Sequence, residues 1–152
     1  KTACLIAASG RFGATFSGAD DEQIERLSRI GGIVGTAFQI SDDVIDIASP
    51  SEESGKTPGT DLREGVKTLP MLYALQDEPD SRLAKLLAGP IADDAEVDEA
   101  LSLLRASSGL LRARATLDDY AARARATLRV LPSGTARDAL ESVSDYVVTR
   151  SH

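Results

Sequence analysis

The chain has 152 residues, 42% of them hydrophobic and 27% charged, so it is long enough for one globular core and too short for two. A formal net charge of −7, with no basic run interleaved with aromatic residues, argues against a nucleic-acid-binding surface. The lone cysteine, Cys4, cannot form an internal disulfide, which favours a cytoplasmic location, and no apolar run reaches the length of a membrane span.

The chain reads as helices throughout, which predicts an all-α fold. Small and apolar residues predict a first helix over residues 1–16. Asp20 or Asp21 then caps a second helix, which has apolar residues at three- and four-residue steps and ends before Pro50. Further helices are predicted at residues 68–76, 81–87, 96–107, 110–130 and 136–149.

Glycine and proline divide this pattern. Gly31, Gly32 and Gly35 lie inside the second helix and lower its helix propensity, so we expect a neighbouring helix to approach closely there. Residues 49–66 have the glycine, proline and serine content of a loop. No stretch alternates between apolar and polar residues for long enough to predict a strand.

The stretch FQISDDVIDI, residues 38–47, places Gln39 and three aspartates in an apolar run. At roughly 3.6 residues per turn, the glutamine and the aspartates Asp42, Asp43 and Asp46 fall within about 100° of one another around the helix. Isoleucine and valine fill the remaining arc. The helix should therefore be wrapped by protein except along this acidic stripe, which comprises the three aspartates.

Carboxylates on one face repel each other unless a cation offsets them, and their oxygens suit a hard cation such as Mg2+. Because Mg2+ keeps several waters and shares its other positions with substrate phosphates, the stripe also predicts a phosphate ligand. A solvated acidic patch is the alternative for a DDxxD motif taken alone. A calcium-binding EF-hand loop starting at Asp42 does not fit, since Val44 and Ile47 would replace an oxygen ligand and a glycine.

A second motif, GKTPGTDLREGVK over residues 55–67, carries Lys56, Arg63 and Lys67 among glycines. Cations on flexible backbone would neutralise the oxygens of a metal-bound diphosphate. The overlapping PSEESGKT is close to the phosphate-binding P-loop pattern, but it has Pro50 in place of the first glycine and no preceding strand. Two glutamates would also lie where phosphate should bind, so we reject a P-loop.

FQISDDVID and GKTPGTDLREGVKTLPMLYAL resemble the second aspartate-rich motif and the downstream lysine loop of the trans-polyprenyl diphosphate synthases, and the opening KTA resembles that family's lysine-threonine pair. The segments follow the family's order within residues 1–76. The rest of the chain is compatible with the family's C-terminal helices. Four arginines there are expected on solvated helix faces rather than among ligands: Arg112, Arg114, Arg123 and Arg125.

This resemblance implies the later half of an antiparallel helical bundle of the isoprenoid-synthase type. It implies an enzyme that ionises an allylic prenyl diphosphate and joins the carbocation to isopentenyl diphosphate, with release of diphosphate. It also implies Mg2+ as the cofactor, held by Asp42, Asp43 and Asp46, with Asp42 as the expected direct ligand.

The resemblance also assigns roles to polar residues outside the stripe. Lys1 and Lys56 would bind diphosphate oxygens, and Phe38 and Gln39 join the expected substrate-binding residues. Gln39 and Thr2 offer oxygen dipoles toward the developing cation, a catalytic role that needs no titratable base. We therefore expect Lys1, Thr2 and Gln39 to be the catalytic residues.

Two departures from the family pattern qualify this expectation. An earlier aspartate-rich motif, a diphosphate-binding arginine and the residues that set product length are not found, so we predict that residues 1–152 are the C-terminal portion of one synthase domain whose first half is absent. Gly65 is followed by Val66 where the family often has lysine. Lys67, one place later, is a candidate substrate-binding replacement.

Two alternatives remain from other classes. One is a catalytically silent prenyl-synthase-like subunit that modulates a partner, which the intact acidic and lysine motifs argue against. The other is a helical terpene cyclase, whose asparagine, serine and glutamate motif is not found. We also expect a homodimer or association with the missing half, because the apolar circumference of residues 24–47 would otherwise be uncovered. His152 is expected to have no catalytic role.

Overall fold

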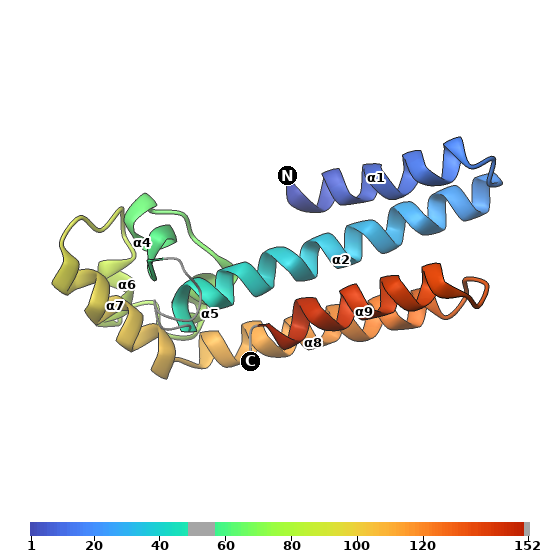
Figure 1. Cartoon of the computed structure of the whole chain (residues 1–152). Helices are drawn as coiled ribbons and strands as arrows, with labels where there is room; N and C mark the ends of the chain where they lie inside the picture. Colours follow the sequence, from blue (N-terminus) through green and yellow to red (C-terminus); the bar gives the residue numbers. More distant parts are fainter. Residues whose placement is uncertain (49–56, 151–152) are drawn as a thin grey trace. The chain divides into compact units, whose positions relative to one another are not determined.

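A computed structural model of the chain describes residues 1–48 and 57–150 (Figure 1). No strand occurs in these two ranges, which confirms the all-α prediction for them. The helices are α1 (Thr2–Phe16), α2 (Asp21–Ala48), α4 (Thr60–Glu64), α5 (Leu69–Asp77), α6 (Arg82–Leu86), α7 (Asp94–Ala106), α8 (Ser108–Leu128) and α9 (Thr135–Thr149).

The chain divides into two units, which we describe separately. Unit 1 comprises residues 1–39 and 117–150, and thus α1, the first part of α2, the last part of α8, and α9. Unit 2 comprises residues 40–116, and thus the end of α2, the four helices from α4 to α7, and the start of α8.

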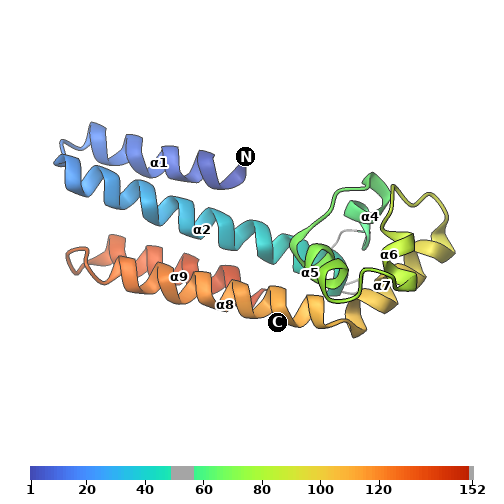
Figure 2. The same ribbon diagram turned by 180° about the vertical axis from the view of Figure 1, so that it is seen from behind.

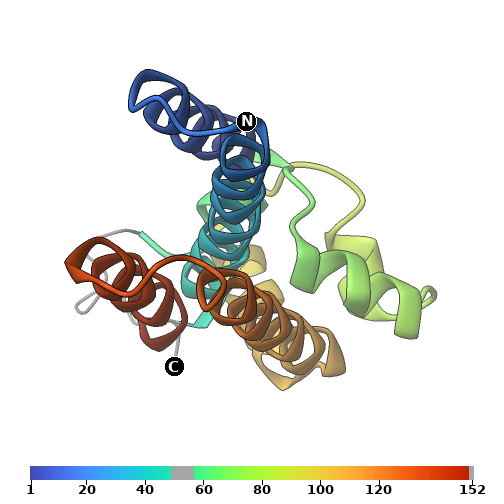
Figure 3. The same cartoon turned by 90° about the vertical axis from the view of Figure 1, so that its right-hand side faces the viewer.

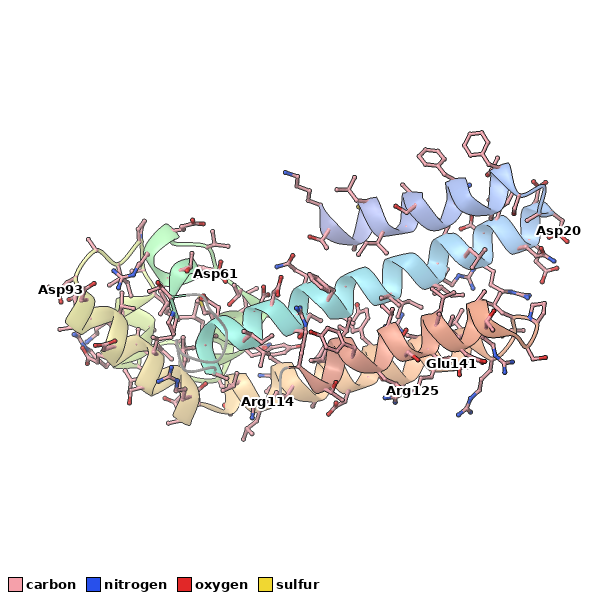
Figure 4. All side chains as sticks on the ribbon, viewed as in Figure 1. Asp20, Asp61, Asp93, Arg114, Arg125 and Glu141 are labelled. Atoms are coloured by element: carbon pink, nitrogen blue, oxygen red, sulfur yellow. The ribbon has the colours of Figure 1, made fainter. Side chains whose placement is uncertain are left out.

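In unit 1, α1 runs antiparallel to the first part of α2, and α9 runs antiparallel to the last part of α8 (Figures 1 and 2). The end-on view in Figure 3 shows α2 between α1 on one side and α8 with α9 on the other. Asp20, labelled in Figure 4 at the start of α2, accepts a hydrogen bond at Oδ1 from the backbone N–H of Gln23 at 2.8 Å. Asp20 is therefore the predicted N-cap. The antiparallel bundle expected from the resemblance is confirmed within this unit.

Small residues bring α1 close to α2. A Cβ atom added at Gly35 would lie 2.6 Å from the Cα atom of Ala3, and one added at Gly31 would lie 2.5 Å from the carbonyl oxygen of Ile6. At Gly32 the nearest atom would be 4.0 Å away. The predicted close approach is thus confirmed at Gly31 and Gly35, where only glycine leaves room for the neighbouring backbone.

Exposed large apolar side chains are found on α1, α5, α8 and α9, and none of those in the described ranges lies on α2. The expectation that the apolar residues of α2 would be left uncovered is wrong, because each of its large apolar side chains is buried or half-buried. Six of its apolar residues are buried: Ile30, Ile33, Ala37, Ile40, Val44 and Ile47. On α1, by contrast, the exposed fractions of Leu5, Phe12 and Phe16 are 61%, 60% and 88%. We call these three residues the α1 apolar face.

In unit 2, α5, α6 and α7 pack against one another. Asp93, labelled in Figure 4, caps α7 by accepting a hydrogen bond from the backbone N–H of Glu96 at 3.1 Å. Arg105 of α7 donates from Nε to the carbonyl oxygen of Ile47 at 2.8 Å, which satisfies an acceptor in the last turn of α2. Buried side chains of these three helices are Pro70, Met71, Ala74, Leu83, Leu86, Val97, Ala100, Leu101 and Leu104.

The predicted loop is wrong in its last part, because residues 60–64 form the helix α4. Gly59 and Gly65 flank it with φ angles of 79° and 70°, a left-handed conformation that favours glycine. The Leu62 side chain is buried, and its burial stabilises the position of the short helix. Five residues are too few to show a helical period, which is why the sequence pattern missed α4. The other helices begin and end within two residues of the predicted positions.

Candidate functional site

The acidic stripe lies on the last two turns of α2, so the helical spacing used to predict it applies. Asp43 is buried, with 9% of its surface exposed, and Asp42 and Asp46 are half-buried. Between them, Val44 has no exposed surface. The three carboxylates are therefore partly removed from water, where negative charge is costly unless hydrogen bonds or a cation compensate it.

Asp46 connects the end of α2 to the start of α4. Its Oδ1 atom accepts a hydrogen bond from the backbone N–H of Thr60 at 3.2 Å, and its Oδ2 atom accepts one from the N–H of Asp61 at 3.3 Å. The backbone N–H of Gly59 also donates to the carbonyl oxygen of Asp46 at 3.1 Å. Residues 59–61 of the second motif thus lie directly beside the acidic stripe. The sequence pattern did not predict which residues of the motif would contact α2.

Asp61, on α4 in Figure 4, is a site residue that sequence reasoning missed. Burial is the first cause that raises its pKa from the ordinary 3.8 to about 6, and the negative charges of its neighbours add to it. In decreasing order of effect, these neighbours are Asp46, Asp43, Glu64 and Asp42. The signal that could have found Asp61 is its place in the lysine-containing motif. We call Asp42, Asp43, Asp46 and Asp61 the carboxylate cluster.

The chemistry of the carboxylate cluster fits a hard divalent cation, because its oxygens are suitable ligands and a cation relieves the repulsion that raises the pKa of Asp61. Within residues 1–48 and 57–150, no three histidine, cysteine or acidic side chains converge closely enough to hold a metal ion unaided. Mg2+ commonly takes one or two carboxylates and completes its shell with waters and phosphates. The cluster therefore fits Mg2+ together with a phosphate ligand, and the ligand role of each aspartate stays a prediction.

In unit 1, the structure brings Thr2 and Gln39 together. The Thr2 hydroxyl Oγ1 donates to the Gln39 Oε1 atom at 3.1 Å. The pair is possible because the close approach at Gly35 places the start of α1 against α2. The two side chains predicted to present oxygen dipoles therefore contact each other, although they are 37 residues apart.

Phe38, predicted to bind substrate, has a partner that sequence reasoning missed. The Arg150 guanidinium carbon lies 4.1 Å from the centre of the Phe38 ring, and Arg150 Nη2 donates to the Phe38 carbonyl oxygen at 3.1 Å. The two residues are 112 positions apart, and no local pattern connects them. The substrate role of Phe38 stays a prediction.

Two of the three predicted lysines lie at the surface. Lys1, immediately before α1, and Lys67 are exposed, and their ammonium groups form no ion pair with another residue of the described ranges. Val66, the departure from the family pattern, is 49% exposed. Lys56 lies outside the described residues, as does His152. Binding of diphosphate by these lysines stays a prediction.

The α8 arginines have structural contacts. Arg112 forms an ion pair with Asp77 and stacks over the Tyr73 ring, with 4.1 Å between its guanidinium carbon and the ring centre. Arg125, labelled in Figure 4, pairs with Asp145 at 2.7 Å. Arg123 is exposed and stacks over Tyr120 at 4.7 Å, while Arg114 is half-buried. The expectation of solvated faces is confirmed for Arg123 and Arg125, which are exposed, whereas Arg112 and Arg114 are half-buried. That none of the four binds a ligand stays a prediction.

Comparison with known proteins places the chain in a family. The sequence profile described as Polyprenyl synthetase matches residues 1–104, so the chain belongs to the polyprenyl synthetase family. It is 63% identical over 152 residues to nonaprenyl diphosphate synthase of Mycobacterium tuberculosis, and 50% identical over 151 residues to dimethylallyltranstransferase of the same species. These alignments cover 99% and 98% of this chain and 45% of each relative.

Solved structures share the fold. Geranylgeranyl pyrophosphate synthase from Corynebacterium glutamicum, complexed with calcium and isoprenyl diphosphate, matches with a TM-score of 0.87 at 44% identity, over 99% of this chain and 48% of that one. Heptaprenyl diphosphate synthase from Staphylococcus aureus matches with a TM-score of 0.90 at 33% identity, over 100% of this chain and 48% of that one. The chain thus spans about half the length of the relatives it matches.

Proposed function

We propose that this chain is the C-terminal portion of a Mg2+-dependent trans-prenyltransferase, whose intact form condenses an allylic prenyl diphosphate with isopentenyl diphosphate. The observation that carries the proposal is the carboxylate cluster, where the family's second aspartate-rich motif meets the lysine-containing motif through Asp46 and Asp61. Membership in the polyprenyl synthetase family supports the same reaction class. The calcium and isoprenyl diphosphate bound by the Corynebacterium glutamicum enzyme support a divalent cation and a diphosphate ligand.

The reaction requires an allylic C–O bond to break, with its electron pair leaving on diphosphate. The allylic cation then adds to the double bond of isopentenyl diphosphate, and the new cation passes a proton to the diphosphate that has left, which leaves a carbon–carbon double bond in the product. Bound Mg2+ would supply charge neutralisation of the leaving diphosphate. Asp42 would be the direct ligand, and Lys1, Lys56 and Lys67 would present ammonium groups to the diphosphate oxygens.

Thr2 and Gln39 would act on the cation. The Gln39 Oε1 atom accepts a hydrogen bond from the Thr2 hydroxyl, with 3.1 Å between the two oxygens, so both oxygens are held in one place before any substrate binds. Oxygen dipoles fixed in this way stabilise developing positive charge without reorganising during the reaction. Neither residue has to accept a proton in this role.

A second candidate is a subunit that works only with a partner component. The chain is 39% identical over 152 residues to a Geobacillus stearothermophilus protein named heptaprenyl diphosphate synthase component 2, whose name indicates a two-component enzyme. A homodimer, or association with the first half of a synthase domain, remains our primary proposal. Activity of the full-length protein without any second protein distinguishes the two candidates.

Within the part of the chain that the structure describes, no helix is both long and apolar enough to cross a membrane. The single cysteine, Cys4, is exposed and unpaired with another cysteine, which is compatible with a reducing compartment. We propose a cytoplasmic location on this ground.

The test uses the full-length protein and its Asp42→Ala variant. Calorimetry with Mg2+ and a non-hydrolysable diphosphate analogue should show ternary binding that falls by at least about 10-fold in the variant, because a direct ligand is lost. Asp98→Ala, at an exposed position of α7, is the matched control and should bind normally. The isolated 152-residue chain should show no prenyl transfer. Unchanged ternary binding in Asp42→Ala would contradict the site assignment, and activity of the isolated chain would contradict its being a portion of a domain.

A further inference from the structure

Arg150 makes two contacts with Phe38 of α2, one with its ring and one with its backbone carbonyl. Its guanidinium carbon lies over the Phe38 ring, 4.1 Å from the ring centre, and its Nη2 atom donates to the Phe38 carbonyl oxygen at 3.1 Å. Both side chains are half-buried, so water screens the contact less than at an exposed position. The backbone N–H of Arg150 donates to Tyr146 at 3.1 Å, which ties Arg150 to the last turn of α9.

The residue after Phe38 is Gln39, whose Oε1 atom accepts the Thr2 hydroxyl at 3.1 Å. Arg150 therefore binds the α2 backbone at the residue immediately before Gln39. The Thr2 hydroxyl binds the amide oxygen at the end of the Gln39 side chain. These residues all belong to unit 1. Two helices from distant parts of the sequence, α1 and α9, thus fix the same short segment of α2.

We propose that Arg150 is a positioning residue for prenyl transfer, acting through Phe38 to hold Gln39 in the orientation that stabilises the allylic cation. This inference rests on the proposed function. A dipole stabilises a developing charge only when it is oriented in advance, and displacement of a catalytic group by a fraction of an ångström lowers the rate rather than the affinity. Arg150 thus affects kcat through its contacts with the Phe38 ring and the Phe38 carbonyl oxygen, and it does not bind diphosphate.

The chemistry of arginine is required for this role. A planar guanidinium can stack on an aromatic face while one of its N–H groups donates sideways, whereas the compact ammonium of lysine cannot make both contacts at once. The positioning role therefore predicts that Arg150→Lys fails, although it keeps the positive charge. Direct binding of diphosphate would predict that the same variant retains function.

The first experiment compares steady-state kinetics of full-length Arg150→Met, Arg150→Lys and Phe38→Leu enzymes, normalised to the folded fraction. We expect kcat to fall on the order of 10-fold in each, with KM for both diphosphate substrates within about 2-fold of wild type in the two Arg150 variants. Phe38→Leu is compared by kcat alone, because Phe38 is itself a predicted substrate-binding residue. The Arg150→Met, Phe38→Leu double variant should be no slower than either single variant, because both remove the same contact. Arg123→Met, which removes the Arg123–Tyr120 stack elsewhere in unit 1, is the matched control and should keep wild-type kinetics.

The second experiment is NMR of the full-length protein with isotopically labelled arginine side chains. Protons above an aromatic ring are shielded, so the Arg150 side-chain resonances should lie upfield of their usual positions and return to them in Phe38→Leu. Absence of this signature would overturn the proposal even where a variant folds poorly. Wild-type kcat in Arg150→Lys, or a raised KM at unchanged kcat, would also overturn it. An inactive wild-type full-length protein would instead overturn the proposed function, which separates the two failures.

Discussion

The carboxylate of Asp46 accepts a hydrogen bond from the backbone N–H of Asp61, with 3.3 Å between the nitrogen and Oδ2. Its other oxygen accepts the N–H of Thr60 at 3.2 Å. Asp46 belongs to the predicted metal-binding stripe, yet both of its carboxylate oxygens accept hydrogen bonds from backbone N–H groups at the start of α4. The three aspartates of the stripe therefore differ in what they do for the folded chain, and this difference can be measured.

Replacement of Asp46 by alanine should lower stability even without metal. The substitution leaves two backbone N–H groups at the start of α4 without their acceptor, which costs about 1 to 3 kcal/mol. Urea unfolding of the 152-residue chain, followed by circular dichroism, measures the change. Asp98→Ala on α7 is the control, because an exposed substitution there should change stability by less than about 0.5 kcal/mol. Equal stability of the two variants would mean that the Asp46 contacts contribute nothing.

The raised pKa of Asp61 predicts how stability depends on pH in the absence of metal. The folded pKa of about 6 lies above the ordinary value of 3.8, so the folded state favours the protonated carboxyl. The stabilising contribution of Asp61 is fully present below about pH 4 and is lost as pH rises through 6.

Melting temperatures between pH 4 and pH 7.5 test this dependence against Asp61→Asn, which cannot ionise. The variant should gain stability relative to wild type as pH rises, since wild-type Asp61 acquires a charge among its acidic neighbours. The difference between the two proteins should be smallest at the acid end. A constant difference across this range would show that the pKa of Asp61 is ordinary.

The contact between α1 and α2 predicts opposite effects of alanine at two glycines of one helix. Gly35→Ala places a Cβ atom 2.6 Å from the Cα of Ala3, so the backbone of α1 must move, at a cost of about 1 to 3 kcal/mol. At Gly32 the nearest atom is 4.0 Å away, so alanine there should stabilise α2 by up to about 1 kcal/mol. The melting temperatures of both variants, compared with that of wild type, measure these changes in stability. A stable Gly35→Ala protein would show that the helices can separate without loss.

The α1 apolar face predicts self-association of the isolated 152-residue chain. Phe12 and Phe16 are 60% and 88% exposed with ring centres 6.5 Å apart, and covering such side chains gains about 1.5 to 3 kcal/mol each. Sedimentation at micromolar concentration should show dimers or larger species, and the Phe12→Ser, Phe16→Ser double variant should shift the chain toward monomer. Leu111→Ser, at a position 67% exposed on α8, is the control and should leave association unchanged. A monomeric wild-type chain would contradict the expected association.

The amino-acid sequence by itself determined the features that depend on neighbouring residues. Helix α2 could be placed from its apolar period and from Asp20, because both the period and the cap act within one or two turns. The acidic stripe followed at once, since helical geometry alone puts Asp42 and Asp46 on one face. The family motifs could be found for the same reason: they are short stretches whose residue types and spacing are local.

The tertiary structure decided which of these local features meet. Asp61 became part of the site because Asp46 holds α4, a five-residue helix between two glycines that shows no period in the sequence. Arg150 reaches Phe38 across 112 positions, and Thr2 reaches Gln39 across 37, through helix packing rather than through any local pattern. Such contacts depend on the path of the connections and on how closely whole helices pack, as at Gly35. Periodicity and motif spacing carry no information about either.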